Sequence, residues 1–278
     1  MSTLADRYRT ALVTGASTGL GRAFVDMLVD EGVRVWGTGR DPDRLPARSG
    51  FTPVALDLDS DQSVEAAFQL ADGAAGGLDL VVNSAGYGLF GPFAEREFAD
   101  WRRQLEAMFV RTLQLSHLAL RGMCARRRGA LVNISSLAVE LPLPFMSGYN
   151  AAKAGLSAFS ESLMVEVAGT GVIVIDFRPG DYRTGFNQTM QATSDPLPPS
   201  ASPTSPRVQH AWARLEANLQ SAPAPARAAG DLRRALRRGR SATVRSGSFF
   251  QARLAPWLPR LAPAWLRRAV TARYFGSS

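Results

Sequence analysis

The order of apolar and amphipathic segments is the feature that most limits how this chain can fold. Short apolar runs alternate with segments in which apolar residues recur at the period of a helix, from residue 10 to about residue 178. Such alternation is typical of βαβ units, in which parallel strands form a sheet between helices. The runs VVN, ALVNIS and VIVIDF are almost entirely apolar, as strands buried on both faces must be. The sequence therefore predicts an α/β fold with a doubly wound parallel sheet and helices on both faces.

The predicted strands are residues 10–14, 33–38, 53–57, 78–83, 130–136 and 172–178, and the predicted helices are residues 20–31, 61–71, 100–127 and 148–168. The pattern breaks beyond residue 184. We expect a Pro- and Ser-rich loop at 193–206, helices near 207–220 and 227–238, a last strand at 241–246 and short Pro-broken helices after it.

Composition narrows the classes of function. One cysteine, Cys124, rules out an internal disulfide, and the two histidines, His117 and His210, lack metal-ligand spacing, so we expect no metal. The N-terminus has no apolar signal segment, and no apolar run approaches the roughly 18 residues that a membrane-spanning helix needs. We therefore predict a soluble cytoplasmic protein.

Positive charge is concentrated near the C-terminus. Residues 227–278 hold 12 Arg and one acidic residue, whereas residues 1–226 hold 20 basic and 23 acidic residues, a net charge of −3. We interpret this tail as a solvated surface, and we expect no nucleic-acid partner because aromatic residues are not interleaved with the basic ones as in a nucleic-acid reader. Weak peripheral membrane contact through residues 249–275, where Phe and Trp accompany Arg, is the alternative.

Four motifs follow predicted strands at their carboxyl ends. They are TGASTGLG at 14–21, NSAG at 83–86, NISS at 133–136 and PGDYRT at 179–184. The carboxyl ends of parallel strands meet at one edge of a sheet, where ligands bind. Glycines at the first strand–helix turn let a pyrophosphate approach the free N–H groups of the helix N-terminus. The sequence thus predicts a dinucleotide site at this edge.

The end of the second predicted strand distinguishes the two nicotinamide cofactors. An acidic residue there would hydrogen-bond the free ribose 2′-hydroxyl of NAD and would repel a 2′-phosphate. Arg40 stands there instead, and Ser17 and Thr18 lie in the facing turn, so we predict NADP(H). The alternative is that Arg40 merely begins a polar loop that contains Asp41 and Asp43.

Tyr149 and Lys153 form a further pair with chemical meaning. Lys153 is the single lysine of a chain whose other 31 basic residues are arginine. Residues four apart share a helix face, and a cation there would lower the pKa of the phenol. A tyrosine needs such help to exchange a proton near neutral pH. The alternative is a surface pair at helical spacing.

Taken in order, TGASTGLG, NSAG, the set Ser136, Tyr149 and Lys153, and PGDYRT make the chain resemble the short-chain dehydrogenase/reductase (SDR) superfamily, in its shorter branch. The resemblance implies a Rossmann-type sheet in one domain over residues 1–278, with a cofactor-binding and catalytic core at 8–186. Residues 187–278 would form a substrate loop and a small helical cap. It also implies NADP(H)-dependent hydride transfer at a carbonyl or secondary-alcohol carbon.

The resemblance also assigns roles to residues. Tyr149 would be the general acid/base, Lys153 would lower its pKa and bind the nicotinamide ribose, and Ser136 would hydrogen-bond the substrate oxygen, whereas Ser135 is expected to be structural. The residues expected to contact the cofactor are Gly15, Ser17, Thr18, Gly19, Leu20, Gly21, Arg40, Asp57, Leu58, Asn83, Ala85, Gly86, Tyr149, Lys153, Pro179, Gly180 and Thr184.

One family feature is missing. The family usually places an asparagine on the helix before the fifth strand, where it helps to position a relay water, and Met108 or Phe109 falls in that slot here. Two explanations are an active enzyme with a different relay and a catalytically degenerate NADP(H)-binding sensor or scaffold. We favour the enzyme because Ser136, Tyr149 and Lys153 are all present.

Apolar stretches are expected around the reacting atoms. They are residues 87–93 and 139–146, together with Phe186 and Met190. They predict a hydrophobic carbonyl or alcohol substrate that is lipid-, steroid-, retinoid- or polyketide-like. Glu140 is the one acidic residue among them, and the sequence suggests no role for it. Since the two long predicted helices correspond to the family's common contact face, we expect a homodimer or homotetramer.

Overall fold

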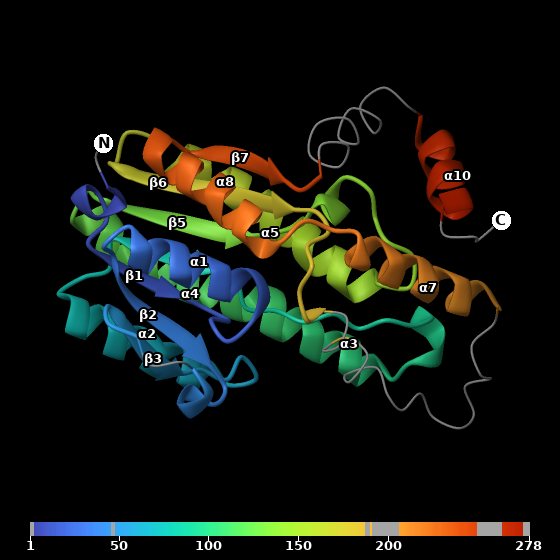
Figure 1. Ribbon diagram of the computed structural model, residues 1–278, viewed down its shortest axis with the longest axis horizontal. Coiled ribbons are helices and arrows are strands. Elements are labelled where there is room, and N and C mark those ends of the chain that lie inside the picture. Colours follow the sequence, from blue (N-terminus) through green and yellow to red (C-terminus); the bar gives the residue numbers. More distant parts are fainter. Residues whose placement is uncertain (1–2, 46–47, 187–189, 191–205, 249–262, 275–278) are drawn as a thin grey trace.

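A computed structural model describes residues 3–45, 48–186, 190, 206–248 and 263–274 (Figure 1). The Pro- and Ser-rich loop predicted at 193–206 lies outside these residues except for its last position, and so do residues 249–262 of the basic tail. Seven strands form one parallel sheet in the order β3-β2-β1-β4-β5-β6-β7. The order reverses between β1 and β4, which confirms the predicted doubly wound sheet.

The strands are β1 (Thr10–Val13), β2 (Arg34–Gly39), β3 (Phe51–Ala55), β4 (Leu80–Asn83), β5 (Gly129–Ile134), β6 (Val172–Pro179) and β7 (Ala242–Ser246). The helices are α1 (Gly19–Asp30), α2 (Asp61–Ala75), α3 (Phe98–Leu105), α4 (Arg111–Ala125), α5 (Ser147–Glu166), α7 (Pro206–Gln220), α8 (Pro225–Arg238) and α10 (Ala264–Tyr274). Short helical turns are η1 (Leu4–Asp6), η2 (Pro42–Arg44), η3 (Phe93–Glu95), η4 (Glu106–Val110) and η5 (Leu137–Val139).

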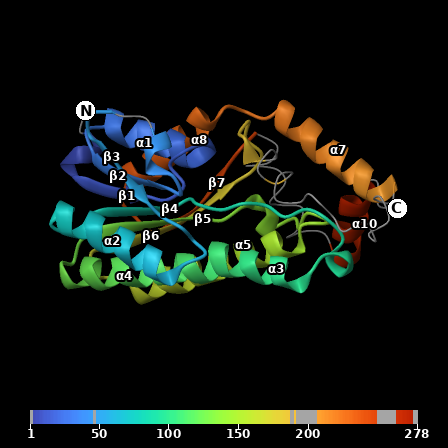
Figure 2. The same ribbon diagram turned by 90° about the horizontal axis from the view of Figure 1, so that it is seen from below.

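Two apolar cores lie on opposite faces of the sheet. Helices α1 and α8 cover one face, and α2, α4 and α5 cover the other (Figure 2). Alternate strand residues supply the two cores, so Ala11 and Val13 pack toward α1 while Leu12 packs toward α2 and α4. Every strand from β1 to β6 except β3 is buried along most of its length. Each fully buried Val or Leu in these strands contributes about 1.5–3 kcal/mol to folding.

The helix predicted over residues 100–127 runs from Phe98 to Ala125 as α3, η4 and α4, which follow one another without a gap. A π-helical turn, η4, separates α3 from α4. Thr112 Oγ1 donates a hydrogen bond to the carbonyl oxygen of Met108 within this region, over 3.0 Å. The predicted helical stretch is therefore confirmed, and the π-helical turn within it is a local feature that the sequence did not indicate. Such insertions are frequent at functional sites.

The C-terminal part contributes to both the sheet and its edge. Helix α8 packs against α1, and β7 pairs in parallel with β6, so these elements extend the layers of the core. Helix α7 instead packs against apolar residues at the carboxyl edge of the sheet. Among the helices that the structure describes, none is long and apolar enough to cross a membrane.

Candidate active site

The glycine-rich turn between β1 and α1 is closely packed. A Cβ atom on Gly21 would lie 2.1 Å from the carbonyl oxygen of Gly15, and one on Gly15 would lie 2.8 Å from Cα of Ala85. Gly15 also has a φ of 69°, which favours glycine. Thr18 precedes α1 without a capping hydrogen bond from its side chain, so the first N–H groups of α1 suit an anion such as a pyrophosphate.

Three of the four motifs meet at this turn. Thr14 Oγ1 accepts hydrogen bonds from the backbone N–H groups of Ser84 and Ala85, both over 3.0 Å. A Cβ on Gly19 would lie 3.4 Å from the side chain of Thr184 in the PGDYRT segment. A pocket of about 480 Å³ opens there and is lined by Gly19, Arg22, Ala23, Asp26, Arg183, Thr184, Gly185 and Pro225. The residues present therefore fit a dinucleotide phosphate group.

Cations gather at the end of β2. Arg40 is exposed there. A hydrogen bond from Arg103, together with the charges of Arg103, Arg40 and Arg111, lowers the pKa of Asp59. Asp41 is engaged within its own turn, where its side chain accepts from the backbone of residue 43 and pairs with the guanidinium of residue 44. Asp41 is thus already paired with a neighbouring arginine of that turn.

Asn83 lies in the interior of the fold. Its Nδ2 donates to Asn133 Oδ1 over 2.8 Å and to Ser116 Oγ over 3.0 Å, and Asn133 Nδ2 donates to Ser160 Oγ over 2.9 Å. This chain of hydrogen bonds joins β4 and β5 to α4 and α5. Asn83 is 4% exposed, and its side chain links these elements at the centre of the sheet.

The other predicted cofactor residues lie along the carboxyl edge of the sheet or beside it. Ser17, Thr18, Asp57 and Gly86 are exposed; Leu20, Leu58, Ala85 and Gly180 are half-buried; Pro179 is buried at the end of β6. The N–H of Gly180 donates to the carbonyl oxygen of Ser246 over 2.7 Å, so β7 supports the turn after β6.

The catalytic candidates come together from β5 and α5. Lys153 is 6% exposed, its Nζ donates to the carbonyl oxygen of Ile134 over 2.7 Å, and it lies 5.8 Å from the centre of the Tyr149 ring. Ser136 follows β5, is 8% exposed, and its Oγ accepts from the N–H of Ala138 over 3.1 Å. The alternative of a surface pair at helical spacing is excluded because Lys153 is buried.

Burial governs the protonation of this set. Burial raises the pKa of Tyr149, a hydrogen bond with Ser136 opposes that increase, and the charge of Asp181 adds to it. Burial also lowers the pKa of Lys153 from an ordinary 10.5 to about 8, although the charge of Asp176 opposes that decrease. In the structure, Ser136 is thus the group that favours the phenolate of Tyr149.

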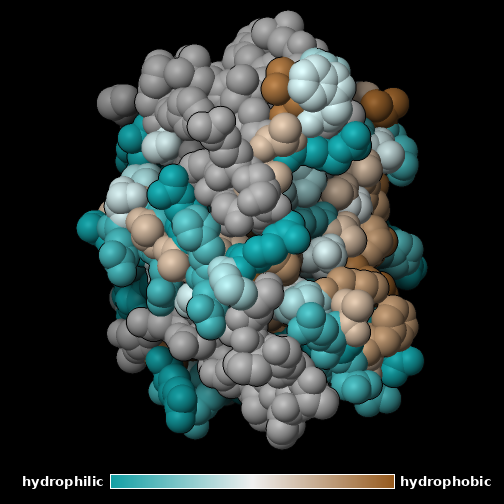
Figure 3. Space-filling view, turned by 90° about the vertical axis from the view of Figure 1, so that its right-hand side faces the viewer, coloured by the Kyte–Doolittle hydropathy of each residue, from teal (hydrophilic) through white to brown (hydrophobic). Residues whose placement is uncertain are grey.

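Apolar side chains border Tyr149. The rings of Tyr149 and Phe186 meet edge to face with centres 5.8 Å apart. Phe90 contacts Phe145 at 5.7 Å and Trp212 of α7 at 5.1 Å. Figure 3 faces the end of the molecule that carries α7, where hydrophobic residues are mixed with polar ones. The sequence reading missed Trp212, although its place in an amphipathic segment was a signal.

Of the two candidates for the missing asparagine slot, Met108 is the one that faces the cofactor edge. It is 1% exposed in η4, and its Cε lies 3.0 Å from the place of a Cβ on Gly86. The Phe109 ring instead packs on α5 beside Gly155. The carbonyl oxygen of Met108 accepts the hydrogen bond from Thr112 within the helix, and its side chain lies against Gly86.

Comparison with known proteins agrees with this geometry. Residues 9–195 match the family model described as short chain dehydrogenase. An uncharacterized oxidoreductase of Myxococcus xanthus is 38% identical over 66% of this chain and 75% of its own length. The 3-oxoacyl-[acyl-carrier-protein] reductase FabG of Vibrio cholerae is 31% identical over 66% of this chain and 77% of its own.

Solved structures of known proteins also resemble this fold. A short-chain dehydrogenase from Streptomyces avermitilis superposes with a TM-score of 0.77 at 27% identity, covering 96% of this chain and 95% of that one. The family model alone spans well over half of the chain. With its parallel sheet, glycine turn and buried Tyr149–Lys153 pair, the chain belongs to the short-chain dehydrogenase/reductase family of nicotinamide-dependent oxidoreductases.

Proposed function

We propose that this protein is an NADP(H)-dependent reductase or dehydrogenase that acts on the carbonyl or secondary-alcohol carbon of a hydrophobic substrate. The observation that carries the proposal is that Ser136, Tyr149 and Lys153 come together at the carboxyl edge of the sheet, the edge that also carries the glycine turn, and that each of them is at least half-buried. A sensor without turnover would not need a lysine held in a position where its charge is costly.

The chain's own residues supply the proton chemistry. When bound, the nicotinamide ring gives or takes the hydride. In reduction, Tyr149 donates its hydroxyl proton to the substrate oxygen, and Ser136 donates a hydrogen bond to the same oxygen. Burial holds the proton on Tyr149 until that oxygen becomes basic. Lys153 then stabilises the phenolate that forms one helical turn away.

The cofactor preference rests on charge at the adenosine end. Arg40 is exposed at the end of β2, and its charge joins those of Arg103 and Arg111 around Asp59. A 2′-phosphate is matched by guanidinium groups and is repelled by an acidic residue, which β2 lacks at this place. These residues support NADP(H) over NAD(H).

The substrate class rests on the apolar lining. Phe90, Phe145, Phe186, Met190 and Trp212 cluster beside Tyr149. The Vibrio cholerae relative is named as a 3-oxoacyl reductase, whose substrate is a ketone on an aliphatic chain. Both support a lipid-like ketone or alcohol as the substrate.

One titration followed by a turnover assay tests the proposal. NADPH and NADH are titrated by fluorescence, and hydrophobic ketones, 3-oxoacyl thioesters and aldehydes are then added to the same sample. We expect tighter binding of NADPH than of NADH and consumption of NADPH with at least one compound. Tight binding without consumption across the panel would favour the nucleotide sensor, and tighter binding of NADH would contradict the cofactor assignment.

A further inference from the structure

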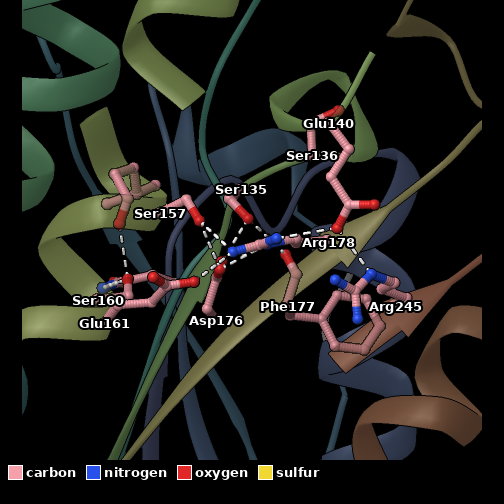
Figure 4. A network of polar contacts seen from close by, with 12 residues as sticks. Ser135, Ser136, Glu140, Ser157, Ser160, Glu161, Asp176, Phe177, Arg178 and Arg245 are labelled. Atoms are coloured by element: carbon pink, nitrogen blue, oxygen red, sulfur yellow. Dashed lines mark hydrogen bonds and ion pairs between the residues drawn. The ribbon is translucent and has the colours of Figure 1, made fainter. Parts of the chain in front are cut away.

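A network of charged and hydroxyl side chains joins β6 to α5 and to the segment that carries Ser136, on the sheet face that α5 covers (Figure 4). Its centre is the pair Asp176 and Arg178 on β6, whose side chains are 0% and 8% exposed. Arg178 Nε donates to Asp176 Oδ2 over 2.7 Å. A buried ion pair is costly to desolvate and is weak evidence for stability. The contacts of this pair therefore indicate a role other than stability.

The pair fixes the segment of Ser136 on both sides. Directly before it, Ser135 Oγ donates a hydrogen bond to Asp176 Oδ1. Four residues after it, Glu140 Oε1 accepts from Arg178 Nη1 over 2.9 Å. Glu140 is also held from β7, where a second arginine donates to the same oxygen over 2.7 Å. Ser136 thus lies in a short segment that β6 holds at both ends.

The same pair fixes α5 on its catalytic face. Ser157 and Glu161 lie one and two helical turns beyond Lys153, so they share its face. Ser157 Oγ donates to Asp176 Oδ2 over 2.7 Å, and Arg178 Nη2 donates to Ser157 Oγ and to Glu161 Oε1, each over 2.7 Å. The part of α5 that directly follows Lys153 on this face is therefore hydrogen-bonded to β6.

We propose that Asp176 and Arg178 are positioning residues, which hold Ser136 in register with Tyr149 and Lys153. Neither would touch the substrate. The inference rests on the proposed function and adds the residues that set its geometry. A displacement of about 1 Å in a catalytic group can lower a rate by about a hundredfold, so a shared anchor for both pieces would matter for turnover.

Variants of the pair test this role. Asp176→Asn keeps the shape of the side chain, and Arg178→Met keeps most of its length. The double variant removes both charges, so that no unpaired buried charge opposes folding. When turnover is measured well below the melting temperature of the double variant, we expect its kcat to be about ten- to a hundredfold lower than that of the unmodified protein. The dissociation constant of NADPH should stay close to that of the unmodified protein. Ser135→Ala and Ser157→Ala each remove one of the side chains that donate a hydrogen bond to Asp176, and each should lower kcat less than the double variant does.

A matched control separates positioning from stability. Leu28 is fully buried on α1, on the opposite face of the sheet. Leu28→Ala should lower the melting temperature but leave kcat unchanged below it. If the double variant of Asp176 and Arg178 behaves like this control, with full kcat and only a lower melting temperature, the positioning role is refuted.

A second readout does not depend on finding the substrate. Crystal structures of the unmodified protein and of the double variant, both grown with NADPH, would give the distance between Ser136 Oγ and the Tyr149 hydroxyl oxygen. We expect this distance to increase in the variant, and an unchanged distance would overturn the inference. Failure of the proposed function would look different, because the unmodified protein would then bind NADPH without turnover while the distance still changed.

Discussion

At the scale of single residues, the site combines a buried phenol with a buried ammonium. Lys153 keeps one short hydrogen bond, to Ile134, and is 6% exposed. Its charge is thus poorly solvated, which lowers its pKa to about 8. Burial acts on Tyr149 in the opposite direction and raises its pKa. Both shifts favour the uncharged side chain, as a low dielectric does. A reacting substrate oxygen or the positive charge of an oxidised nicotinamide would then favour the charged form of Tyr149.

Removal of the Tyr149 hydroxyl tests its role as the proton donor. Tyr149→Phe should lower turnover by about 10²–10⁴-fold, the usual contribution of a general acid, while NADPH binding stays nearly intact. Initial rates and a fluorescence titration measure the two effects. Tyr8 is also buried but precedes β1, at the opposite end of that strand from the site, so Tyr8→Phe should keep full turnover. A Tyr149→Phe variant with normal turnover would eliminate the mechanism.

The pKa of Lys153 predicts how stability depends on pH. An unfolded lysine keeps its proton up to about pH 10.5, whereas Lys153 in the fold loses it near pH 8. Between these values the unfolded state holds more protons, so the free energy of unfolding should increase with pH, by roughly 3 kcal/mol in total. Urea unfolding of the cofactor-free protein from pH 7 to pH 10 measures this. The difference from Lys153→Met isolates the effect, and a pH-independent difference would contradict it.

The charge of Arg40 predicts a change in cofactor preference. Arg40→Asp should weaken NADPH binding by about ten- to a hundredfold, because one charge-assisted hydrogen bond is worth roughly 1.5–3 kcal/mol. NADH binding should change much less. Arg44 is also exposed in the following turn but pairs with Asp41, so Arg44→Asp is the matched control. Equal weakening of NADPH and NADH by Arg40→Asp would remove Arg40 from the phosphate site.

At the scale of elements, the site depends on how β1 and α1 are joined. The turn closes onto the segment after β4, and close contacts leave no room for side chains at Gly15 and Gly21. The π-helical turn in the helix before β5 is a second feature of this scale. The π-helical turn places Met108 against Gly86, so the residue in the missing asparagine slot shapes the edge of the site.

The tight turn predicts a strong effect of one methyl group. Gly21→Ala places a Cβ 2.1 Å from the carbonyl oxygen of Gly15, so the turn must open. NADPH binding should weaken at least about tenfold, or 1.4 kcal/mol. Gly73 in α2 has nothing within 4 Å of an added Cβ. Gly73→Ala should therefore leave binding unchanged and increase stability by about 0.5–1 kcal/mol. Unchanged binding in Gly21→Ala would show that the turn does not hold the cofactor.

At the scale of the whole molecule, the substrate side is assembled from distant segments. Residues after β4, residues before α5, the segment after β6 and helix α7 meet around Phe90 and Tyr149. The sheet orients all of them, since each follows the carboxyl end of a strand or packs on such a segment. Helix α7 is the part that gives this edge an apolar cover.

Helix α7 predicts a separate control of substrate binding. Trp212→Ala should raise KM for a hydrophobic substrate by about ten- to a hundredfold, because it removes roughly 1.5–3 kcal/mol of apolar contact. NADPH affinity should not change. Trp265 on α10 is 64% exposed, so Trp265→Ala should have no effect on either quantity. Equal KM values for Trp212→Ala and the unmodified enzyme would place the substrate away from α7.

The sequence by itself determined the fold class, located the glycine turn and singled out the candidate catalytic set. These depend on local patterns, namely strand–helix alternation, glycine spacing and the four-residue spacing of Tyr149 and Lys153 along a helix. Strand and helix bounds agreed to within a few residues. The π-helical turn at Glu106–Val110 within the predicted helix was missed because such a turn leaves no distinct pattern of apolar residues.

Only the tertiary structure decided which distant groups share an environment. The run VIVIDFRP is that of an apolar strand, yet the alternation of its side chains places Asp176 and Arg178 under α5. There Asp176 accepts hydrogen bonds from Ser135 and Ser157. Glu140 likewise gained partners on β6 and β7 that lie 38 and 105 residues away. The shift in the pKa of Lys153 arises from burial, which no spacing in the sequence encodes. Pairings of this kind depend on where the fold brings faces together, so they follow from packing and not from local pattern.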